Sequence, residues 1–163
     1  MEIRVDFDRL LAHDRWANGE ALTSVEAMAT PPAKALELLG HIMGAEVCWI
    51  DRMTAGKDPA DWERWERMDA AALRRAWQEE LPGRCAGVLG DAALSDPARR
   101  FSYLNVLGKP GEARVEDALL QLMLHSAYHR GQVATAVRAG GGTPAVVDFL
   151  HAVRTGALAG PST

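Results

Sequence analysis

Two histidines, His125 and His129, stand in the run His-Ser-Ala-Tyr-His and are the residues best placed for chemistry. On a helix they lie one turn apart and share a face, so they can hold one ion between them. A buried neutral imidazole needs partners for both ring nitrogens, and a divalent cation can meet that need. Because this spacing is also common in histidines that only hydrogen-bond to neighbours, the pair alone leaves a metal site and a structural role open.

His41 is the candidate for a third ligand. It lies midway along another expected helix, and metal sites in helical bundles use side chains from facing helices. It stands at the edge of the apolar face of its helix, flanked by Leu38, Ala45 and Trp49, so an inward and an exposed orientation are both open. Three histidines that leave one position for water or substrate form a metal site of the reactive kind.

Other polar side chains fall on helix faces that should be buried. Asp14 and Asn18 lie one turn apart on the apolar face of the first expected helix, and Gln132 shares the face of the two histidines. They form either a buried polar network that fixes helix register or a group that orients a ligand histidine or binds substrate. His13 and His151 are expected at the surface or in packing contacts.

Missing motifs narrow the chemistry. The residues between His125 and His129 are Ser-Ala-Tyr, so the glutamate of the HExxH zinc-protease motif is absent. Di-iron bundles need repeated Glu-x-x-His, and no Glu stands three residues before any histidine. The sequence therefore predicts one metal ion or none.

Helical periodicity dominates the chain and predicts an all-α protein, a four-helix bundle with a short fifth C-terminal helix. We expect one domain over 1–155 and a flexible tail at 156–163. The segment 57–68 is expected to be a loop with at most a short helical turn, and 96–112 an irregular connection with a short extended piece at 101–106. The expected helices run over about 5–28, from a Thr30 cap and Pro31-Pro32 to Gly56, from an Asp69 cap to about 89 with a break at Pro82, over 114–139, and from 143–144 onward.

The composition indicates a soluble globular domain, with 163 residues, 48% hydrophobic and 25% charged. A net charge of −4 argues against a nucleic-acid or anionic-membrane partner bound by bulk electrostatics. No stretch is long enough to span a membrane, and no secretory signal is recognisable. Cys48 and Cys85 are too few for a disulfide framework and are expected to be small half-buried hydrophobes, so the cytoplasm is the expected compartment.

A second apolar stripe on the helix over 114–139 faces nearly opposite the histidines. It consists of Leu120, Leu124, Ala127 and Gly131. An outer helix should not be apolar on two sides, so another element must cover this stripe. We expect a homodimer, with packing by the fifth helix as the alternative.

Three segments of the chain carry a family resemblance. They are His-Asp-Arg-Trp-Ala-Asn at 13–18, His-Ile-Met-Gly-Ala-Glu-Val-Cys-Trp-Ile-Asp-Arg at 41–52, and His-Ser-Ala-Tyr-His-Arg-Gly-Gln-Val-Ala-Thr at 125–135, which continues through Gly-Gly-Thr-Pro to Asp148 and Phe149. With these motifs the chain resembles the DinB family of small bacterial four-helix-bundle proteins. The third segment is the most specific of them.

The resemblance implies a divalent metal, often nickel or zinc, held by His41, His125 and His129. Family members usually carry tyrosine where His13 stands, so His13 could alter the pocket mouth or supply a fourth ligand. Asn18 and Gln132 would be positioning groups at best.

The resemblance also implies a function. Some relatives transfer low-molecular-weight thiols such as bacillithiol, mycothiol or glutathione to electrophilic small molecules, or isomerise through such adducts, and many have no assigned activity. The expected chemistry is a metal that lowers the pKa of a bound thiol. The alternatives are a metal-dependent hydrolase and a non-catalytic, stress-related ligand-binding bundle with a structural metal.

Overall fold

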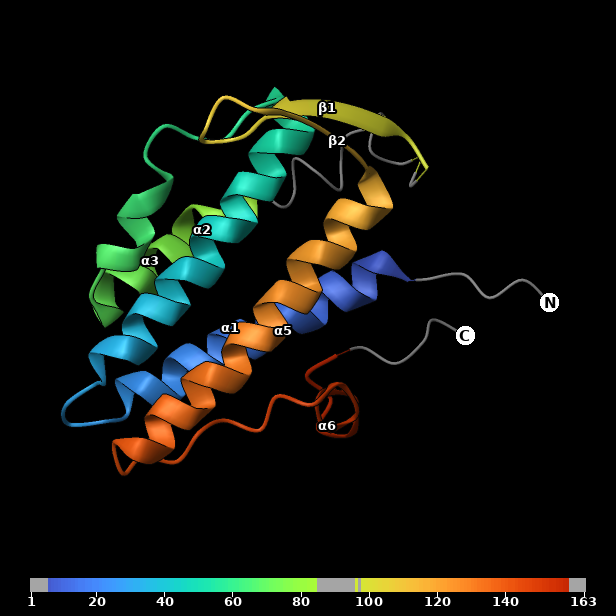
Figure 1. Cartoon of the computed structure of the whole chain (residues 1–163). Coiled ribbons are helices and arrows are strands. Elements are labelled where there is room, and N and C mark those ends of the chain that lie inside the picture. Colours follow the sequence, from blue (N-terminus) through green and yellow to red (C-terminus); the bar gives the residue numbers. More distant parts are fainter. Residues whose placement is uncertain (1–5, 85–95, 97, 159–163) are drawn as a thin grey trace.

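The computed structural model describes residues 6–84, 96 and 98–158, which are mostly helical. The long helices are α1 (Phe7–Glu26), α2 (Ala33–Ala55) and α5 (Val115–Ala139). Helices α2 and α5 run side by side, and α1 passes behind α5 (Figure 1). The 3-10 helix η1 (Trp62–Arg67) lies against α2, α3 (Ala70–Glu79) contacts α1 and α2, and the short helix α6 is Phe149–Arg154. In the described part of the chain, no helix combines the length and apolarity needed to cross a bilayer.

The helix ends follow local capping chemistry. The Asp69 carboxylate accepts a hydrogen bond from the Ala72 amide at 2.7 Å, which confirms the predicted cap of α3. Helix α2 ends at Gly56, as predicted, where a φ of +72° favours glycine. The predicted Thr30 cap is wrong: Pro32 occupies the N-cap position, because its carbonyl accepts from the amides of the first turn of α2.

One other predicted helix boundary needs correction. The fifth helix begins at Phe149 rather than at 143–144, because its N-cap residue Asp148 has extended backbone angles. The Val147 carbonyl just before this cap lies 3.0 Å from Nε2 of His13 on α1. The predicted break of the next helix near Pro82 is confirmed, although it comes slightly earlier: α3 stops at Glu79, and residues 81–84 are helical again. The expected start near residue 5 and end near residue 89, Cys85, and residues 159–163 of the expected tail lie outside the described residues.

The connection between α3 and α5 contains a hairpin that the sequence predicted only as one extended piece. Strands β1 (Arg100–Leu104) and β2 (Pro110–Arg114) pair antiparallel, with Phe101 opposite Ala113. The Asn105 side chain accepts from two amides of the turn, and Gly108 supplies a φ of +66°. The hairpin covers the end of the α2–α5 pair (Figure 1).

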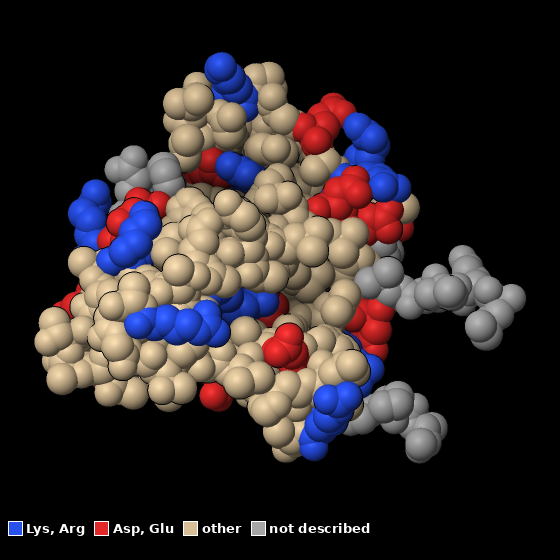
Figure 2. All heavy atoms as spheres, turned by 60° about the horizontal axis from the view of Figure 1, so that its bottom comes forward, with Lys and Arg blue, Asp and Glu red and all other residues tan. Residues whose placement is uncertain are grey.

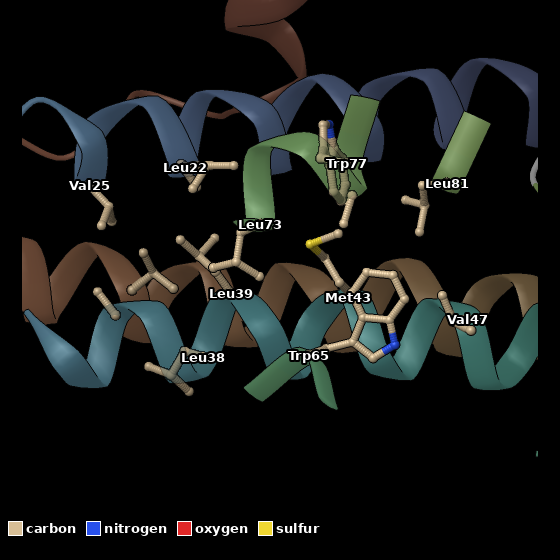
Figure 3. Packing of buried hydrophobic residues seen from close by; sticks show 14 of the residues in the cluster. Leu22, Val25, Leu38, Leu39, Met43, Val47, Trp65, Leu73, Trp77 and Leu81 are labelled. Carbon is tan, nitrogen blue, oxygen red and sulfur yellow. The ribbon is translucent and has the colours of Figure 1, made fainter. Parts of the chain in front are cut away.

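Buried hydrophobic side chains form two clusters in the described part of the chain. The larger joins α1, α2, η1, α3 and the second half of α5. Figure 3 shows Leu73 and Trp77 of α3 pointing toward Leu39 and Met43 of α2, with Trp65 of η1 beside them. The smaller cluster joins the last turns of α2, strand β1 and the first half of α5. Because burial of each large apolar side chain contributes about 1.5–3 kcal/mol, these clusters hold α2 and α5 together.

The close approach of η1 to α2 depends on Gly40. A Cβ atom at this position would lie 2.1 Å from the carbonyl oxygen of Trp65 and 2.8 Å from the Cα of Glu66. These are backbone atoms and cannot move aside cheaply, so only glycine permits this approach. The contact places η1 next to the middle of α2, where His41 stands.

We therefore expect Gly40→Ala to lower the free energy of unfolding by about 1–3 kcal/mol, the usual cost of overpacking. Gly19→Ala is the matched control, because its Cβ would meet Trp77 at an ordinary 3.7 Å, and alanine there should stabilise α1 by roughly 0.5–1 kcal/mol. Urea denaturation followed by circular dichroism measures both. Equal stability of the two variants would contradict the packing argument.

Candidate metal centre

His41 of α2 and His125 and His129 of α5 converge at one place between the two helices. The Nε2 atoms of His41 and His125 are 3.2 Å apart. The ring centroids are separated by 5.0 Å for His41 and His125, 4.7 Å for His41 and His129, and 4.5 Å for His125 and His129. One nitrogen from each ring lies within 4.8 Å of those of the other two. The sequence left the orientation of His41 open, and the structure turns it toward α5.

An acceptor holds the outer nitrogen of His41. Its Nδ1–H donates to Oε1 of Glu66 at 2.8 Å, and Glu66 reaches this position because η1 packs against Gly40. A proton fixed on Nδ1 leaves the lone pair of Nε2 facing the other two rings. The carboxylate therefore sets both the tautomer and the direction of the imidazole.

Gln132 does the same for His129. The Nδ1–H of His129 donates to Oε1 of Gln132 at 3.2 Å, so Nε2 is again the nitrogen left free. This hydrogen bond is consistent with one of the two roles predicted for Gln132, that of orienting a histidine. In His125 the Nδ1 atom is buried and has no hydrogen-bond partner in the described structure.

The local environment favours neutral rings. Burial, followed by the neighbouring rings of His129 and His41, lowers the pKa of His125 to about 4. Burial also lowers the pKa of His129, partly opposed by its hydrogen bond to Gln132. A neutral imidazole is the form that binds a metal, so at neutral pH these rings need not release a proton first.

The donor set fits a divalent cation. Two imidazole nitrogens that bind one zinc ion tetrahedrally lie about 3.3 Å apart, from bond lengths of about 2.0–2.1 Å. The observed 3.2 Å between Nε2 of His41 and Nε2 of His125 is close to this separation. Without a cation, one of these two rings must donate a proton to the other, although the second nitrogen of His125 is already buried without a partner.

The other candidate ligands lie elsewhere. Within the described ranges no fourth His, Cys, Asp or Glu joins the three histidines. His13, which was expected in a surface or packing role and could otherwise have altered the pocket mouth or supplied a fourth ligand, lies 3.0 Å from the Val147 carbonyl through its Nε2 and packs against Phe149 with ring centroids 5.0 Å apart. Cys48 is buried, and burial raises the pKa of its thiol to about 12, so it behaves as the small hydrophobe that was predicted.

One comparison with known proteins found a match. The model of the DinB family matches residues 24–156, which cover α2, the hairpin, α5 and α6. The chain belongs to the DinB family. No curated protein and no solved structure matches the chain.

A buried polar network lies next to the three histidines of this DinB protein. On α5 the Nη1 of Arg130 donates to Oδ1 of Asp14 at 2.5 Å and to Oδ1 of Asn18 at 2.6 Å. The Nδ2 of Asn18 donates to Oε1 of Glu46 at 2.7 Å, and the Ser126 hydroxyl donates to the same oxygen at 3.3 Å. Asp14 and Asn18 therefore belong to the buried network that was one of their two predicted roles, and it joins α1, α2 and α5.

One carboxyl of this network favours a bound proton. Burial, followed by the nearby charge of Asp14, raises the pKa of Glu46 well above its ordinary value. Burial also raises the pKa of Asp14, but the guanidinium of Arg130 opposes that change. The stable arrangement is therefore an Arg130–Asp14 ion pair beside a neutral Glu46, with no net buried charge.

The sequence analysis missed Glu66, Glu46 and Arg130. Glu46 and Arg130 were detectable, because each falls on the buried face of a long helix, where a charged residue needs a partner. Glu66 had no such signal, since it lies in a segment without periodicity. The Trp49 ring lies 4.5 Å from the Arg52 guanidinium and 5.8 Å from the Tyr103 ring.

We expect Arg130→Leu to lower the free energy of unfolding by about 3–5 kcal/mol, because Asp14 is then buried without its partner. Arg100→Leu is the control: this exposed arginine pairs with Glu112 on the surface, where an ion pair is worth about 0–1 kcal/mol. Urea denaturation measures both. Similar losses in the two variants would contradict a structural role for the buried pair.

The free energy of unfolding of the metal-free protein should also depend on pH through His125, in the range between the folded and unfolded pKa values of this residue. The folded value of about 4 lies below the ordinary 6.5, so the unfolded chain binds the proton more readily in this window. The stability that neutral His125 contributes is therefore lost as pH falls from 6.5 toward 4. His125→Gln should show a smaller fall in chelator-treated protein, because Asp14 and Glu46 titrate in both proteins. If the wild type and His125→Gln gave parallel curves of unfolding free energy against pH, His125 would not be the group that causes the loss of stability.

Proposed function

We propose that this DinB protein binds one divalent metal ion, nickel or zinc, through His41, His125 and His129, and uses it to transfer a low-molecular-weight thiol to an electrophilic small molecule. The observation that supports this most directly is the convergence of three imidazole nitrogens with no fourth side-chain ligand among the described residues. Structural zinc sites are usually closed by four protein ligands, whereas catalytic sites keep a position open. We also propose the four-helix-bundle arrangement of the family for α1, α2, α3 and α5.

A divalent metal bound here supplies a Lewis acid that lowers the pKa of a bound thiol or water. The chain's own residues prepare the site for it. Glu66 and Gln132 hold protons on the outer nitrogens of His41 and His129, so the inner nitrogens present lone pairs. Burial keeps His125 and His129 neutral.

The thiol must come from a small molecule, because the described cysteine cannot serve as the nucleophile. Cys48 is buried and its pKa is raised to about 12, so it carries almost no thiolate at neutral pH. In the proposed reaction, the sulfur of the small thiol forms a bond to the electrophilic carbon. The leaving group departs with its bonding electron pair, and the thiol proton passes to solvent.

The first experiment measures metal in protein purified without an affinity tag. We expect close to one ion per chain in the wild type and loss of it in His125→Ala. Glu66→Gln should keep the fold but weaken zinc binding by roughly 10–100-fold, the usual effect of removing the carboxylate behind a metal-bound histidine. Glu112→Gln, an exposed carboxylate on β2, should leave the affinity unchanged. Unchanged metal content in His125→Ala would overturn the site.

The second experiment follows the fluorescent adduct of monochlorobimane with glutathione, bacillithiol or mycothiol. We expect zinc- or nickel-loaded protein to accelerate adduct formation with at least one thiol, and a chelator or His41→Ala to abolish the acceleration. A protein that holds its metal but consumes electrophilic substrates equally well without thiol would be a hydrolase. A protein that holds its metal but catalyses neither thiol transfer nor hydrolysis would be a binding protein.

A further inference from the structure

Exposed large hydrophobic side chains gather mainly at two places in the described part of the chain. On the outer stripe of α5, Leu124 and Tyr128 are each 67% exposed, so the fifth helix does not cover this stripe and the expected homodimer stays a prediction. The second place is the hairpin tip, residues 104–109, where Leu104, Val106 and Leu107 are 51%, 49% and 72% exposed. Turns in water usually carry polar side chains, so three apolar ones at a single turn indicate an apolar partner.

The backbone of the hairpin tip satisfies most of its own donors. The amides of Leu107 and Lys109 donate to the Asn105 side chain, each at 3.0 Å. The Gly108 amide donates to the Asn105 carbonyl at 2.8 Å, and the Asn105 amide donates to the Lys109 carbonyl at 3.1 Å. A buried amide is costly only when it loses its acceptor, so these four amides can leave water at little cost.

Two cations without partners flank the apolar side chains. Lys57 and Lys109 are exposed, and neither ammonium group has a partner among the described residues. At several edges of the face seen in Figure 2, basic and acidic side chains instead lie next to one another. The carboxylate of Asp58 accepts two hydrogen bonds from Arg52, at 2.5 and 3.0 Å, and Glu112, the acidic residue of the hairpin, pairs with the first residue of β1. The hairpin tip is therefore locally positive.

The segment that follows α2 holds one of these cations beside the apolar side chains. The Leu104 amide donates to the Gly56 carbonyl at 2.9 Å, and the Asp58 amide donates to the Leu104 carbonyl at 3.2 Å, which pairs Lys57 with Leu104. An open cleft of about 360 Å³ lies between this segment and the turn, and Lys57, Leu104 and Val106 are among the residues that line it. A cation next to apolar side chains suits an anionic amphiphile.

A lipid surface fits these features better than a protein partner does. Because most amides of the turn are already bonded, the tip offers few hydrogen-bonding groups to another polypeptide. A bilayer interface needs only apolar side chains that enter it and cations that meet its phosphates. The net charge of −4 opposes long-range attraction to an anionic surface, so docking depends on this local set of side chains.

We propose that the hairpin tip docks on an anionic lipid bilayer, with Leu104, Val106 and Leu107 in the interfacial layer and the ammonium groups of Lys57 and Lys109 among the lipid phosphates. Lysine suits this position, because its aliphatic stem lies along apolar surface while its charge stays in the headgroup region. The contact is weak and reversible, since one turn buries little apolar surface. The proposal does not depend on the metal or on the proposed reaction.

Co-sedimentation of the full chain with vesicles made of equal parts of phosphatidylcholine and phosphatidylglycerol tests the docking. We expect the wild type to bind and Leu107→Glu to lower the partition coefficient roughly tenfold or more, because it removes the most exposed apolar side chain of the tip and adds a negative charge. Leu150→Glu is the matched control: Leu150 is 60% exposed on α6, away from the hairpin in Figure 1, and should bind as the wild type does. A wild type that does not bind, or equal losses in the two variants, would overturn the proposal.

The lysines test the electrostatic part of the contact. Lys57→Ala and Lys109→Ala should each lower the partition coefficient roughly fivefold on the anionic vesicles and have no effect on vesicles of phosphatidylcholine alone. Lys34→Ala, at the opposite end of α2 from Lys57, should leave binding unchanged. Equal losses in all three variants would indicate attraction to the whole molecule and contradict docking by the hairpin tip.

Sedimentation velocity without lipid separates a bilayer from a protein partner. We expect Leu107→Glu and Leu150→Glu to behave alike in this measurement. Self-association that is lost in Leu107→Glu alone would assign the hairpin tip to a second copy and overturn the lipid proposal. Thermal unfolding followed by circular dichroism confirms that each variant is folded.

Discussion

The buried guanidinium of Arg130 is the constraint on which the rest of this molecule depends. A charge inside a protein must be neutralised and hydrogen-bonded, and here a carboxylate and an amide of α1 do both. The same amide also binds Glu46, so α2 is included in the arrangement. Helices that share such a network cannot slide past one another without breaking several hydrogen bonds at once. The relative register of α1, α2 and α5 follows from this requirement.

That register in turn determines where the histidines meet. Along α5, Ser126 and Arg130 point into the network, and His125 and His129 precede them by one position, which is a turn of about 100° around the helix. The histidines therefore face the seam with α2 rather than the core centre. His41 stands at the same level of α2, because α2 and α5 pack side by side. One helix thus serves two purposes: its inner face holds the network and one flank carries two histidines.

Protonation states complete the site. A cluster of three imidazoles is stable only if the rings do not all become charged, and burial keeps His125 and His129 neutral. The acceptors Glu66 and Gln132 then hold the proton of His41 and of His129 on Nδ1, which leaves Nε2 unprotonated in both rings. The result is a set of three imidazoles with no fourth side-chain ligand among the described residues, while the described thiol, Cys48, stays protonated in the core. Binding of a cation and an exogenous thiol suits this division of roles better than chemistry on the chain's own cysteine.

The amino-acid sequence by itself determined most of the local structure. Periodicity located α1, α2 and α5 closely, the Asp69 cap and Gly56 marked helix ends correctly, and the spacing of His125 and His129 placed them on one face. These features depend on neighbours a few residues apart, which a sequence displays directly. The sequence also placed Asp14 and Asn18 on a buried face, but it could not name their partner, because Arg130 is more than a hundred residues away.

Only the tertiary structure determined the orientation of His41, the carboxylate that accepts its hydrogen bond and the contacts of His13. His41 lies at the border of an apolar face, where two orientations cost nearly the same until the opposing helix is present. Glu66 reaches it through a backbone contact at Gly40, and η1 has no periodic pattern from which that contact could be foreseen. His13 is held by a carbonyl from the other end of the chain. Contacts between distant segments depend on how whole helices pack, and that packing energy is shared among many residues rather than written in any short stretch of sequence.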